Sequence, residues 1–355
     1  MQAITLQRLG EVAVEQREEP RLIEPGDAIV KVTTAAICGS DLHIVSGRDA
    51  GVRLGTIMGH EFVGVIEELG SEVEGLTSGD RVVAPFTVSC GCCFFCRREL
   101  PARCLDSQGF GFVTGAGRGL QGAQAEWVRV PLAASSLMKI PEAHTDGTAL
   151  LDEQALFLGD IFSTAYSCAE KARIQPGDGV VVIGCGPVGL LCILAARLLG
   201  AGTVVALDTV EYRLEKARAF GALTAAPDLA PAAVLLAELT EGRGADAALE
   251  AVGAPAALDL ALALVRPGAV VSIAGYHTEP SYALPIQGAY GKNLTLTIGR
   301  CNARAYMPRL LPLVLEKQVR LTEIISHVLP LSEAAHGYHI FANRLDRAIK
   351  VLLKP

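Results

Sequence analysis

The sequence predicts an α/β protein with a doubly wound parallel sheet, preceded by a second domain that is rich in β-strands. From about Gly177, short apolar runs alternate with helical runs, the order that builds a parallel sheet covered by helices on both faces. The first ~150 residues instead carry short alternating runs separated by glycine and proline. With 355 residues, 50% of them hydrophobic, the chain is long enough for about two domains and too apolar for wholesale disorder.

The N-terminal region is expected to form a barrel-like or sandwich arrangement. Its strand-like runs carry β-branched residues in alternation and are bounded by glycine and proline. They are DAIVKVTTAAICG at 27–39, FVGVIEELG at 62–70 and DRVVAPFTV at 80–88.

The second region is expected to alternate strands and helices. Strands are predicted at 180–184, 203–208, 245–253, 269–275 and 294–299, and helices at 187–201, 211–222, 229–240 and 257–265. The alternation then stops, and a helix at 309–317 and a strand at 348–353 follow. The uncharged stretch at 179–196 has the length of a short membrane span, but GCGPVG interrupts it. We therefore interpret it as a buried strand, a glycine turn and a buried helix.

A glycine-rich turn joins the first strand of the second region to its helix. The turn consists of Gly184, Cys185, Gly186, Pro187, Val188 and Gly189. It fits G-x-G-x-x-G, and its place between a strand and a helix is the context that the dinucleotide-binding motif requires. Asp208 ends the next strand about 20 residues on, where a carboxylate binds the adenosine ribose and repels a 2′-phosphate. The pattern favours NAD over NADP. Arg213 could soften that preference, but its place on the next helix favours a solvated face.

Four cysteines lie close together in a polar loop. They are Cys90, Cys93, Cys96 and Cys104, spaced C-x2-C-x2-C-x7-C. Four thiolates from one short loop are the usual ligands of a structural zinc. A bacterial iron–sulfur motif would have a shorter last spacing with proline after the final cysteine, and a redox C-x-x-C pair would leave two cysteines unexplained. Cys92 is a spare thiol that could take the place of Cys93.

A second group of metal-binding residue types follows two strand-like runs of the N-terminal region. It comprises Cys38 with Ser40, Asp41 and His43, and His60 with Glu61. A thiolate, an imidazole and nearby carboxylates are a combination that binds zinc, whereas a lone cysteine or histidine is more often core packing. A zinc site needs a third ligand, and Asp160 in FLGDIFSTAY is the candidate.

Together these pieces resemble the zinc-dependent medium-chain alcohol dehydrogenases over the full length of the chain. The resemblance lies in ICGSDLH, GHEFVGVIEELGSEV, GDRVVAPF, the CGCCFFC lobe, the DIFSTAY segment and GCGPVG with Asp208. Through GRGLQGAQAEWVRVP the chain is most similar to the bacterial formaldehyde-dehydrogenase-like branch. The resemblance implies a GroES-like catalytic domain at 1–154 and 300–355, and a Rossmann domain at 155–299. It also implies one catalytic and one structural Zn²⁺, with NAD as the cofactor.

Roles for the metal ligands follow from this resemblance. Cys38, His60 and Asp160 would hold the catalytic zinc, with aspartate where the animal enzymes have a second cysteine. Three protein ligands would leave a fourth position for water or substrate. Glu61 would either approach the metal during ligand exchange or stay behind the ligands as a carboxylate, and Asp41 would fix the His60 tautomer.

The resemblance also implies roles around the metal. Ser40 would take the alcohol proton and His43 would pass it to solvent, although His43 could instead be a phosphate or surface contact. Thr164 would contact the nicotinamide. Lys350 would reach the pyrophosphate or be a solvated residue at a strand end, and Phe86 would line the substrate pocket or the core.

The expected function is reversible oxidation of a primary or secondary alcohol by NAD to an aldehyde or ketone. The alternative within the family is a formaldehyde or aldehyde dehydrogenase or dismutase, which would keep NADH bound between half-reactions. A non-catalytic dinucleotide-binding protein is disfavoured because such a protein needs no open metal site. The substrate itself is not readable from motif spacing.

Composition and charge exclude other classes of protein. Lys and Arg number 31 and Asp and Glu 38, so a net charge of −7 gives no general attraction to nucleic acid or anionic lipid. Ten cysteines and a start without an apolar core fit a reducing, cytoplasmic location rather than a secreted disulfide scaffold. We expect a homo-oligomer, a tetramer or alternatively a dimer, in which the strand at 294–299 extends the sheet across a two-fold axis.

Overall fold

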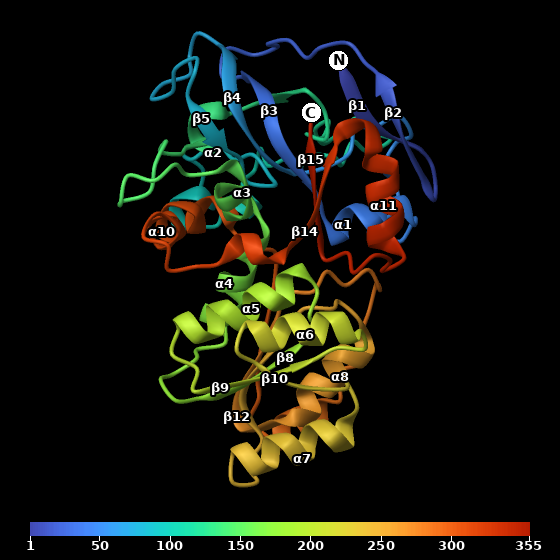
Figure 1. The fold of residues 1–355 in the computed structure, drawn as a ribbon, viewed down its shortest axis with the longest axis vertical. Helices are drawn as coiled ribbons and strands as arrows, with labels where there is room; N and C mark the ends of the chain where they lie inside the picture. The colour runs from blue at the N-terminus through green and yellow to red at the C-terminus, as the bar shows by residue number, and fades with distance from the viewer. The chain divides into compact units, whose positions relative to one another are not determined.

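The computed structural model describes residues 1–355 and divides into two compact units. The first unit comprises residues 1–163 and 302–355, and the second comprises residues 164–301. The C-terminal segment thus returns to the unit in which the chain began, as the red and blue ribbons of Figure 1 show. The predicted fold class, a parallel α/β sheet plus a β-rich region, is confirmed.

The first unit is built on a seven-stranded sheet. Its strands are β3 (Ala28–Ile37), β4 (Glu61–Leu69), β5 (Arg81–Val83), β6 (Trp127–Val130), β7 (Met138–Lys139), β14 (Ile325–Pro330) and β15 (Lys350–Lys354). They run in the order β14-β15-β3-β4-β5-β7, with β6 also paired to β3, and β1 (Gln2–Arg8) and β2 (Glu11–Gln16) form a separate hairpin. The core packs Phe62 edge-on against Phe110, with ring centroids 5.2 Å apart.

The helices of the first unit are mostly short. They are α1 (Gly39–Val45), α2 (Ala133–Ser136), α3 (Asp152–Ala155), α10 (Ala303–Leu315) and α11 (Ala334–Ala342). Helix α10 begins six residues before the predicted 309 and contains Pro308 and Pro312. Each proline removes one helical N–H donor. Burial of Tyr306, Met307 and Leu310 on one face keeps the segment helical nonetheless.

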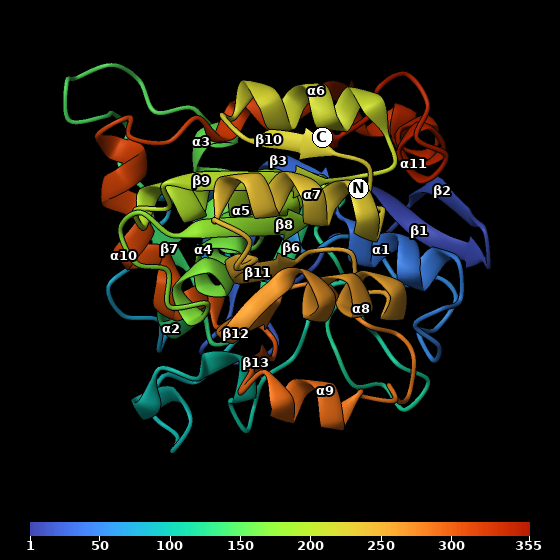
Figure 2. The same ribbon diagram turned by 90° about the horizontal axis from the view of Figure 1, so that it is seen from below.

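The second unit is a six-stranded parallel sheet. Its strands are β8 (Gly179–Ile183), β9 (Thr203–Leu207), β10 (Leu223–Ala225), β11 (Ala245–Glu250), β12 (Val265–Ile273) and β13 (Thr295–Ile298). Their order is β10-β9-β8-β11-β12-β13, which can be followed from top to bottom of Figure 2. All five residues of β8 are buried, as expected for a strand at the centre of a parallel sheet.

Helices connect these parallel strands. They are α4 (Ile161–Lys171), which begins at the end of the first unit, α5 (Pro187–Leu198), α6 (Glu211–Ala219), α7 (Leu229–Leu239), α8 (Pro255–Leu264) and α9 (Ile286–Gly291). Helix α5 contacts β8 and β9, and α8 contacts β11 and β12. The strands and helices predicted here are present, and the short elements β10 and α9 are additional. None of the helices combines the length and apolar character that crossing a bilayer requires.

Candidate metal and dinucleotide sites

Four potential metal ligands converge in the interior of the first unit. The Cys38 sulfur, a His60 ring nitrogen and carboxylate oxygens of Glu61 and Asp160 all lie within 4.8 Å of one another, and all four residues are buried. Three of them are the ligands predicted from the sequence. Glu61 is within reach of the same point, so its carboxylate lies close enough to approach a metal there.

The β3–β4 pairing places two of these ligands. Ala36 lies opposite Glu61 in the antiparallel register, so Cys38, just after β3, and His60, just before β4, come to the same end of the ladder. Asp160 arrives from a separate segment, between the 3-10 turn 156–159 and α4. Gly159 allows this approach, because a Cβ atom there would lie 2.1 Å from the Ala84 carbonyl oxygen.

The spacing of the ligand atoms suits a zinc ion. Tetrahedral ligands with bonds of about 2.0–2.3 Å lie roughly 3.3–3.8 Å apart. The Cys38 sulfur lies 3.7 Å from Asp160 Oδ2, and His60 Nε2 lies 3.3 Å from the same oxygen. The donor types and these two spacings therefore fit Zn²⁺.

Asp41 orients the histidine of the cluster. It is the third residue of α1, and its Oδ2 accepts a hydrogen bond of 2.9 Å from the Cys38 N–H, as in a capping box. Its Oδ1 lies 3.2 Å from His60 Nδ1, which leaves His60 Nε2 to face Asp160. Gln124 donates to Asp41 Oδ2 and accepts from the Tyr338 hydroxyl, so Gln124 and Tyr338 in turn help to hold the Asp41 carboxylate in place. Gln124 lies in the GRGLQGAQAEWVRVP segment but has no role there in the sequence analysis, and Tyr338 lies in none of the motifs.

The cluster concentrates negative charge. Burial and the neighbouring carboxylates of Glu61 and Asp160 raise the pKa of the Cys38 thiol. Burial opposes protonation of His60, but the Asp41 carboxylate and the Cys38 sulfur outweigh it and raise the pKa of the imidazole well above its usual value. The protein thus places several groups that hold protons tightly around one point, which is the electrostatic setting of a bound cation.

Glu61 and Lys350 form a buried ion pair beside the cluster. Lys350 Nζ lies 2.6 Å from Glu61 Oε1 and donates to the Ile37 carbonyl oxygen at 3.1 Å, and neither side chain is exposed. Burial opposes the charge of Lys350, but Glu61 and Cys38 raise the pKa of its ammonium group. Lys350 is therefore not the solvated residue at a strand end that was one of its two sequence interpretations.

Ser40 and His43 share one face of α1, since they are three residues apart. Ser40 Oγ donates to the Cys38 sulfur at 3.3 Å and lies 3.1 Å from His60 Nε2, so the hydroxyl touches two ligand atoms. His43 is partly exposed. Phe86 is partly buried, and its N–H donates to the Gly159 carbonyl beside Asp160. Thr164 is the first residue of the second unit.

The four lobe cysteines also gather around one point. Cys90, Cys93, Cys96 and Cys104 offer sulfurs within 4.8 Å of one another, and Cys92 is not in this set. The Cys90–Cys104 sulfurs are 3.4 Å apart and the Cys93–Cys96 sulfurs 3.6 Å, close to the ~3.8 Å edge of a zinc–sulfur tetrahedron. Backbone N–H groups of Cys96 and Leu105 lower the pKa of Cys93 to about 6, which favours the thiolate that a metal needs.

The glycine turn has the geometry of a phosphate-binding loop. Gly184 has a φ of 90° and connects β8 to α5, with Pro187 as the first residue of the helix. A Cβ atom on Gly189 would lie 1.8 Å from the Gly184 carbonyl oxygen, whereas one on Gly186 would meet nothing within 4 Å. Gly189 thus serves helix–strand packing, and Gly186 leaves open space on the ligand side.

Asp208 follows β9 beside this turn. Its Oδ2 accepts from the Cys185 N–H at 2.7 Å and its Oδ1 from the Val210 N–H at 2.9 Å, which fixes the carboxylate. Arg213 Nη1 lies 4.0 Å from Asp208 Oδ2, and the Arg213 side chain is only 14% exposed. The expected solvated face for Arg213 is wrong, because the side chain folds back toward Asp208 instead of extending along α6.

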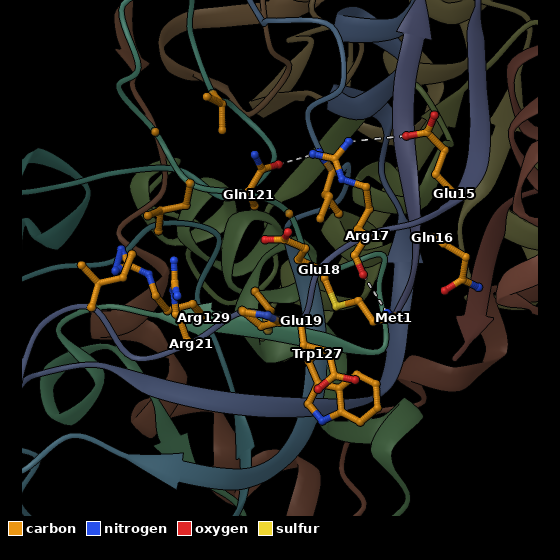
Figure 3. A pocket seen from close by; sticks show the side chains of 18 residues that line it. Met1, Glu15, Gln16, Arg17, Glu18, Glu19, Arg21, Gln121, Trp127 and Arg129 are labelled. Carbon is orange, nitrogen blue, oxygen red and sulfur yellow. Dashed lines mark hydrogen bonds and ion pairs between the residues drawn. The ribbon is translucent and has the colours of Figure 1, made fainter.

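A separate cavity lies on the first unit, near β2 and β6. It has a volume of about 960 Å³, and its lining includes Arg17, Arg21, Trp127 and Arg129 (Figure 3). Its charged groups are paired locally: the Met1 ammonium donates to the Arg17 carbonyl, and Arg129 donates to Asp27. None of the eight metal-cluster residues lines this cavity, so its size does not bear on the metal chemistry.

Comparisons with known proteins agree with this class of fold and site. Residues 24–142 match the alcohol dehydrogenase GroES-like domain, and residues 187–316 match the zinc-binding dehydrogenase domain. An uncharacterized zinc-type alcohol dehydrogenase-like protein of Bacillus subtilis is 36% identical over the full length of both chains. The glutathione-independent formaldehyde dehydrogenase of Bacillus subtilis is 32% identical over 96% of this chain and 93% of its own.

A solved structure shows the same likeness in three dimensions. The alcohol dehydrogenase TADH from Thermus sp. ATN1 is 40% identical, superimposes with a TM-score of 0.92 and covers 100% of this chain and 99% of its own. The fold and the site define a two-unit oxidoreductase with two clusters of potential metal ligands, one of four cysteines and one of mixed residue types. The chain belongs to the zinc-dependent medium-chain alcohol dehydrogenase family.

Proposed function

We propose that the chain oxidises a primary or secondary alcohol with NAD, and runs the reverse reduction of the aldehyde or ketone, at a zinc held by Cys38, His60 and Asp160. The observation that carries the proposal is the convergence of these three ligands, from three separate segments, at zinc-ligand spacing. When bound there, the zinc supplies Lewis-acid stabilisation of the substrate oxygen. A further Zn²⁺ in the four-cysteine lobe, closed by four thiolates, would be structural.

Four further residues near the metal site have proposed roles in proton transfer and in holding the metal ligands. The Ser40 hydroxyl, in contact with Cys38 and His60, is placed to accept the alcohol proton, and His43 on the same helix face would pass it to solvent. Asp41 holds the His60 tautomer. Glu61 stays against Lys350 as a negative charge behind the ligands, available to the metal when a ligand exchanges.

The glycine turn and Asp208 would bind the cofactor. The N–H groups at the start of α5 suit a pyrophosphate, and the fixed Asp208 carboxylate suits ribose hydroxyl groups. Its negative charge would repel a 2′-phosphate, so we propose NAD over NADP even though Arg213 lies nearby. Thr164 at the nicotinamide and Lys350 at the pyrophosphate remain proposals from the family resemblance. A contact between Lys350 and the pyrophosphate would require the Lys350 ammonium group to bind the pyrophosphate and Glu61 at the same time.

A second candidate is aldehyde oxidation or dismutation within the same family. It is supported by the similarity to the formaldehyde dehydrogenase of Bacillus subtilis. In such an enzyme NADH stays bound between half-reactions. Native mass spectrometry of the purified protein distinguishes the two, because retained nucleotide favours the aldehyde reaction and its absence favours the alcohol reaction.

For assembly, we propose a tetramer, or alternatively a dimer, with β13 at the interface. β13 is the edge strand of the six-stranded sheet, and Ile298 on it is 75% exposed. We also propose a cytoplasmic location, because all ten cysteines are free thiols and nine of them, all but Cys92, sit in metal clusters or in the buried interior of the chain.

The metal mechanism is tested with Cys38→Ser. We expect the zinc content to fall from about two ions per chain to about one, and NADH formation from simple alcohols to fall by more than about 100-fold. A variant that kept both ions and full activity would contradict the proposed site. Screening alcohols, aldehydes and polyols with the unchanged protein would identify the substrate class.

A further inference from the structure

The cysteine lobe carries one more sulfur than its metal site uses. Cys92 lies outside the set formed by Cys90, Cys93, Cys96 and Cys104. Its side chain is exposed, and its thiol donates to the Cys90 sulfur at 3.7 Å. Cys92 is the only cysteine of the lobe that contacts the metal ligands without being one of them.

The backbone holds these two sulfurs on the same side. Gly91 between them has a φ of 74°, a left-handed conformation that glycine adopts readily. Across this glycine the sulfurs of Cys90 and Cys92 lie 3.7 Å apart. From 3.7 Å the sulfurs would need to close to about 2.05 Å to form a disulfide, a movement that side-chain rotation in an exposed loop can supply.

A metal-bound cysteine is a thiolate and therefore a nucleophile toward peroxides. The other three cysteines are ligands as well, so each must leave the metal before it can attack a neighbouring oxidised sulfur. Cys92 has no such bond to break. It stands in the position of a resolving thiol next to a reactive thiolate, the arrangement that converts a first oxidation into a disulfide.

We propose that Cys92 makes the lobe an oxidation site, at which peroxide forms a Cys90–Cys92 disulfide and releases the structural zinc. The Cys90 thiolate attacks one oxygen of hydrogen peroxide and displaces hydroxide, giving a Cys90 sulfenic acid. The Cys92 sulfur then attacks the Cys90 sulfur; the sulfenic oxygen leaves as water with the Cys92 proton. Two thiol sulfurs are oxidised by two electrons in total, and one peroxide is reduced.

The consequence for the metal follows from ligand chemistry. A disulfide sulfur is not a zinc ligand, so the site would keep three of its four thiolates. The lobe backbone is organised by these sulfurs, since the N–H groups of Cys90 and Asp106 donate to the Cys104 sulfur. Loss of the ion would loosen the loop, and a dithiol reductant with added zinc would restore it.

The experiment compares the intact protein with Cys92→Ser, both fully reduced and loaded with zinc. Hydrogen peroxide is added in the presence of a chromogenic zinc chelator, and zinc release is followed by absorbance. We expect the release of about one ion per chain to be roughly tenfold slower in the variant, because the resolving step is absent. Peptide mass spectrometry of the oxidised intact protein should show the Cys90–Cys92 disulfide, removable by dithiothreitol.

Two controls make the result specific. An organomercurial, which takes every thiolate, should release equal zinc from both proteins and show that both were loaded. The inference rests on the structural-zinc part of the proposed function, and a zinc count before oxidation separates the two. A lobe without zinc would defeat the metal proposal. Equal release rates in both loaded proteins, or a Cys93–Cys96 disulfide in place of Cys90–Cys92, would overturn the role of Cys92.

Discussion

The buried Glu61–Lys350 pair is the residue-scale feature with the largest energetic consequence. Both side chains are fully buried, and removal of one partner leaves an unpaired charge in the interior. We expect Lys350→Met to destabilise the protein by about 3–5 kcal/mol. Replacing both, as Glu61→Gln with Lys350→Met, should recover much of that loss. Thermal unfolding of the unchanged protein and the two variants measures this, and a double variant no more stable than Lys350→Met would show that the charges are not coupled.

The aspartate ligand gives a second prediction. Asp160→Ala removes one ligand and should cost the catalytic zinc while leaving the lobe zinc in place, so the zinc content falls from about two to about one per chain. Asp160→Cys supplies a thiolate of similar reach and should keep the ion. Metal analysis of both variants checks this. Zinc retained by the alanine variant would mean that Glu61 or water completes the site without Asp160.

Cys185 gives a pH-dependent prediction. Burial, with a contribution from the Asp208 carboxylate, raises the pKa of its thiol to about 12. An unfolded cysteine titrates near 8.5, so above that pH the unfolded chain loses a proton that the folded chain retains, and folding stability falls as pH rises. At pH 10 this amounts to about 2 kcal/mol.

Cys185→Ala removes this pH-dependent loss of folding stability. The thermal midpoint of the variant should therefore fall less between pH 7.5 and pH 10 than that of the unchanged protein. The pKa of Cys192 is raised by its hydrogen bond with Cys168 and by burial, and the pKa of Tyr338 is raised by burial; both groups contribute equally to both proteins. Parallel midpoints across this range would count against the assignment.

The sequence predicts the site residues that lie close to one another along the chain. The cysteine lobe and the pairs around Cys38 and His60 are close in sequence, so their residue types and distances suffice. Asp160 lies 122 residues from Cys38, so no spacing connects the two; the sequence offers Asp160 as a candidate third ligand, and the family resemblance is what gives it that role. Gln124, Tyr338 and the Glu61–Lys350 pair, 289 residues apart, depend on which strands become neighbours, and no local pattern records that.

At the scale of elements, two glycines at the β8–α5 junction differ in their surroundings: Gly189 packs against protein atoms, and Gly186 faces open space. Gly189→Ala should lower the thermal midpoint, because its Cβ would collide with the Gly184 carbonyl of the protein itself. Gly186→Ala has no protein atom to meet and an ordinary φ of −68°, so stability should be kept while the KM for NAD rises about tenfold or more. Unfolding curves and steady-state kinetics distinguish the pair. Equal loss of stability in both would contradict this division.

The sequence predicts helices and strands best where burial of the whole element makes its apolar residues a continuous run. The central strands β8 and β9 are long apolar runs next to clear helical periods, and they are where the sequence placed them. β10 has three residues and no apolar run, and α9 has six, so neither stands out. Helix α10 begins at Ala303 and not at the predicted 309, because packing of Tyr306 and Met307 keeps the turn before Pro308 helical.

At the scale of the whole molecule, the exposed edge strand gives the test of assembly. Ile298→Lys on β13 should lower the molar mass measured by light scattering, because a charge at a strand pairing across a two-fold axis is unfavourable. Leu223→Lys on β10, the opposite edge of the same sheet and 45% exposed, is the matched control and should leave the mass unchanged. An Ile298 variant with unchanged mass would place the interface elsewhere.

The return of the C-terminal segment to the first unit constrains the timing of folding during synthesis. β15 pairs with β3, and Lys350 binds the Ile37 carbonyl 313 residues earlier in the chain. The second unit, residues 164–301, is contiguous and can fold while the ribosome is still translating. The sheet beside the Cys38, His60 and Asp160 cluster cannot close until the final strand has left the exit tunnel, so the glycine turn of the second unit can form before Glu61 has its buried partner Lys350.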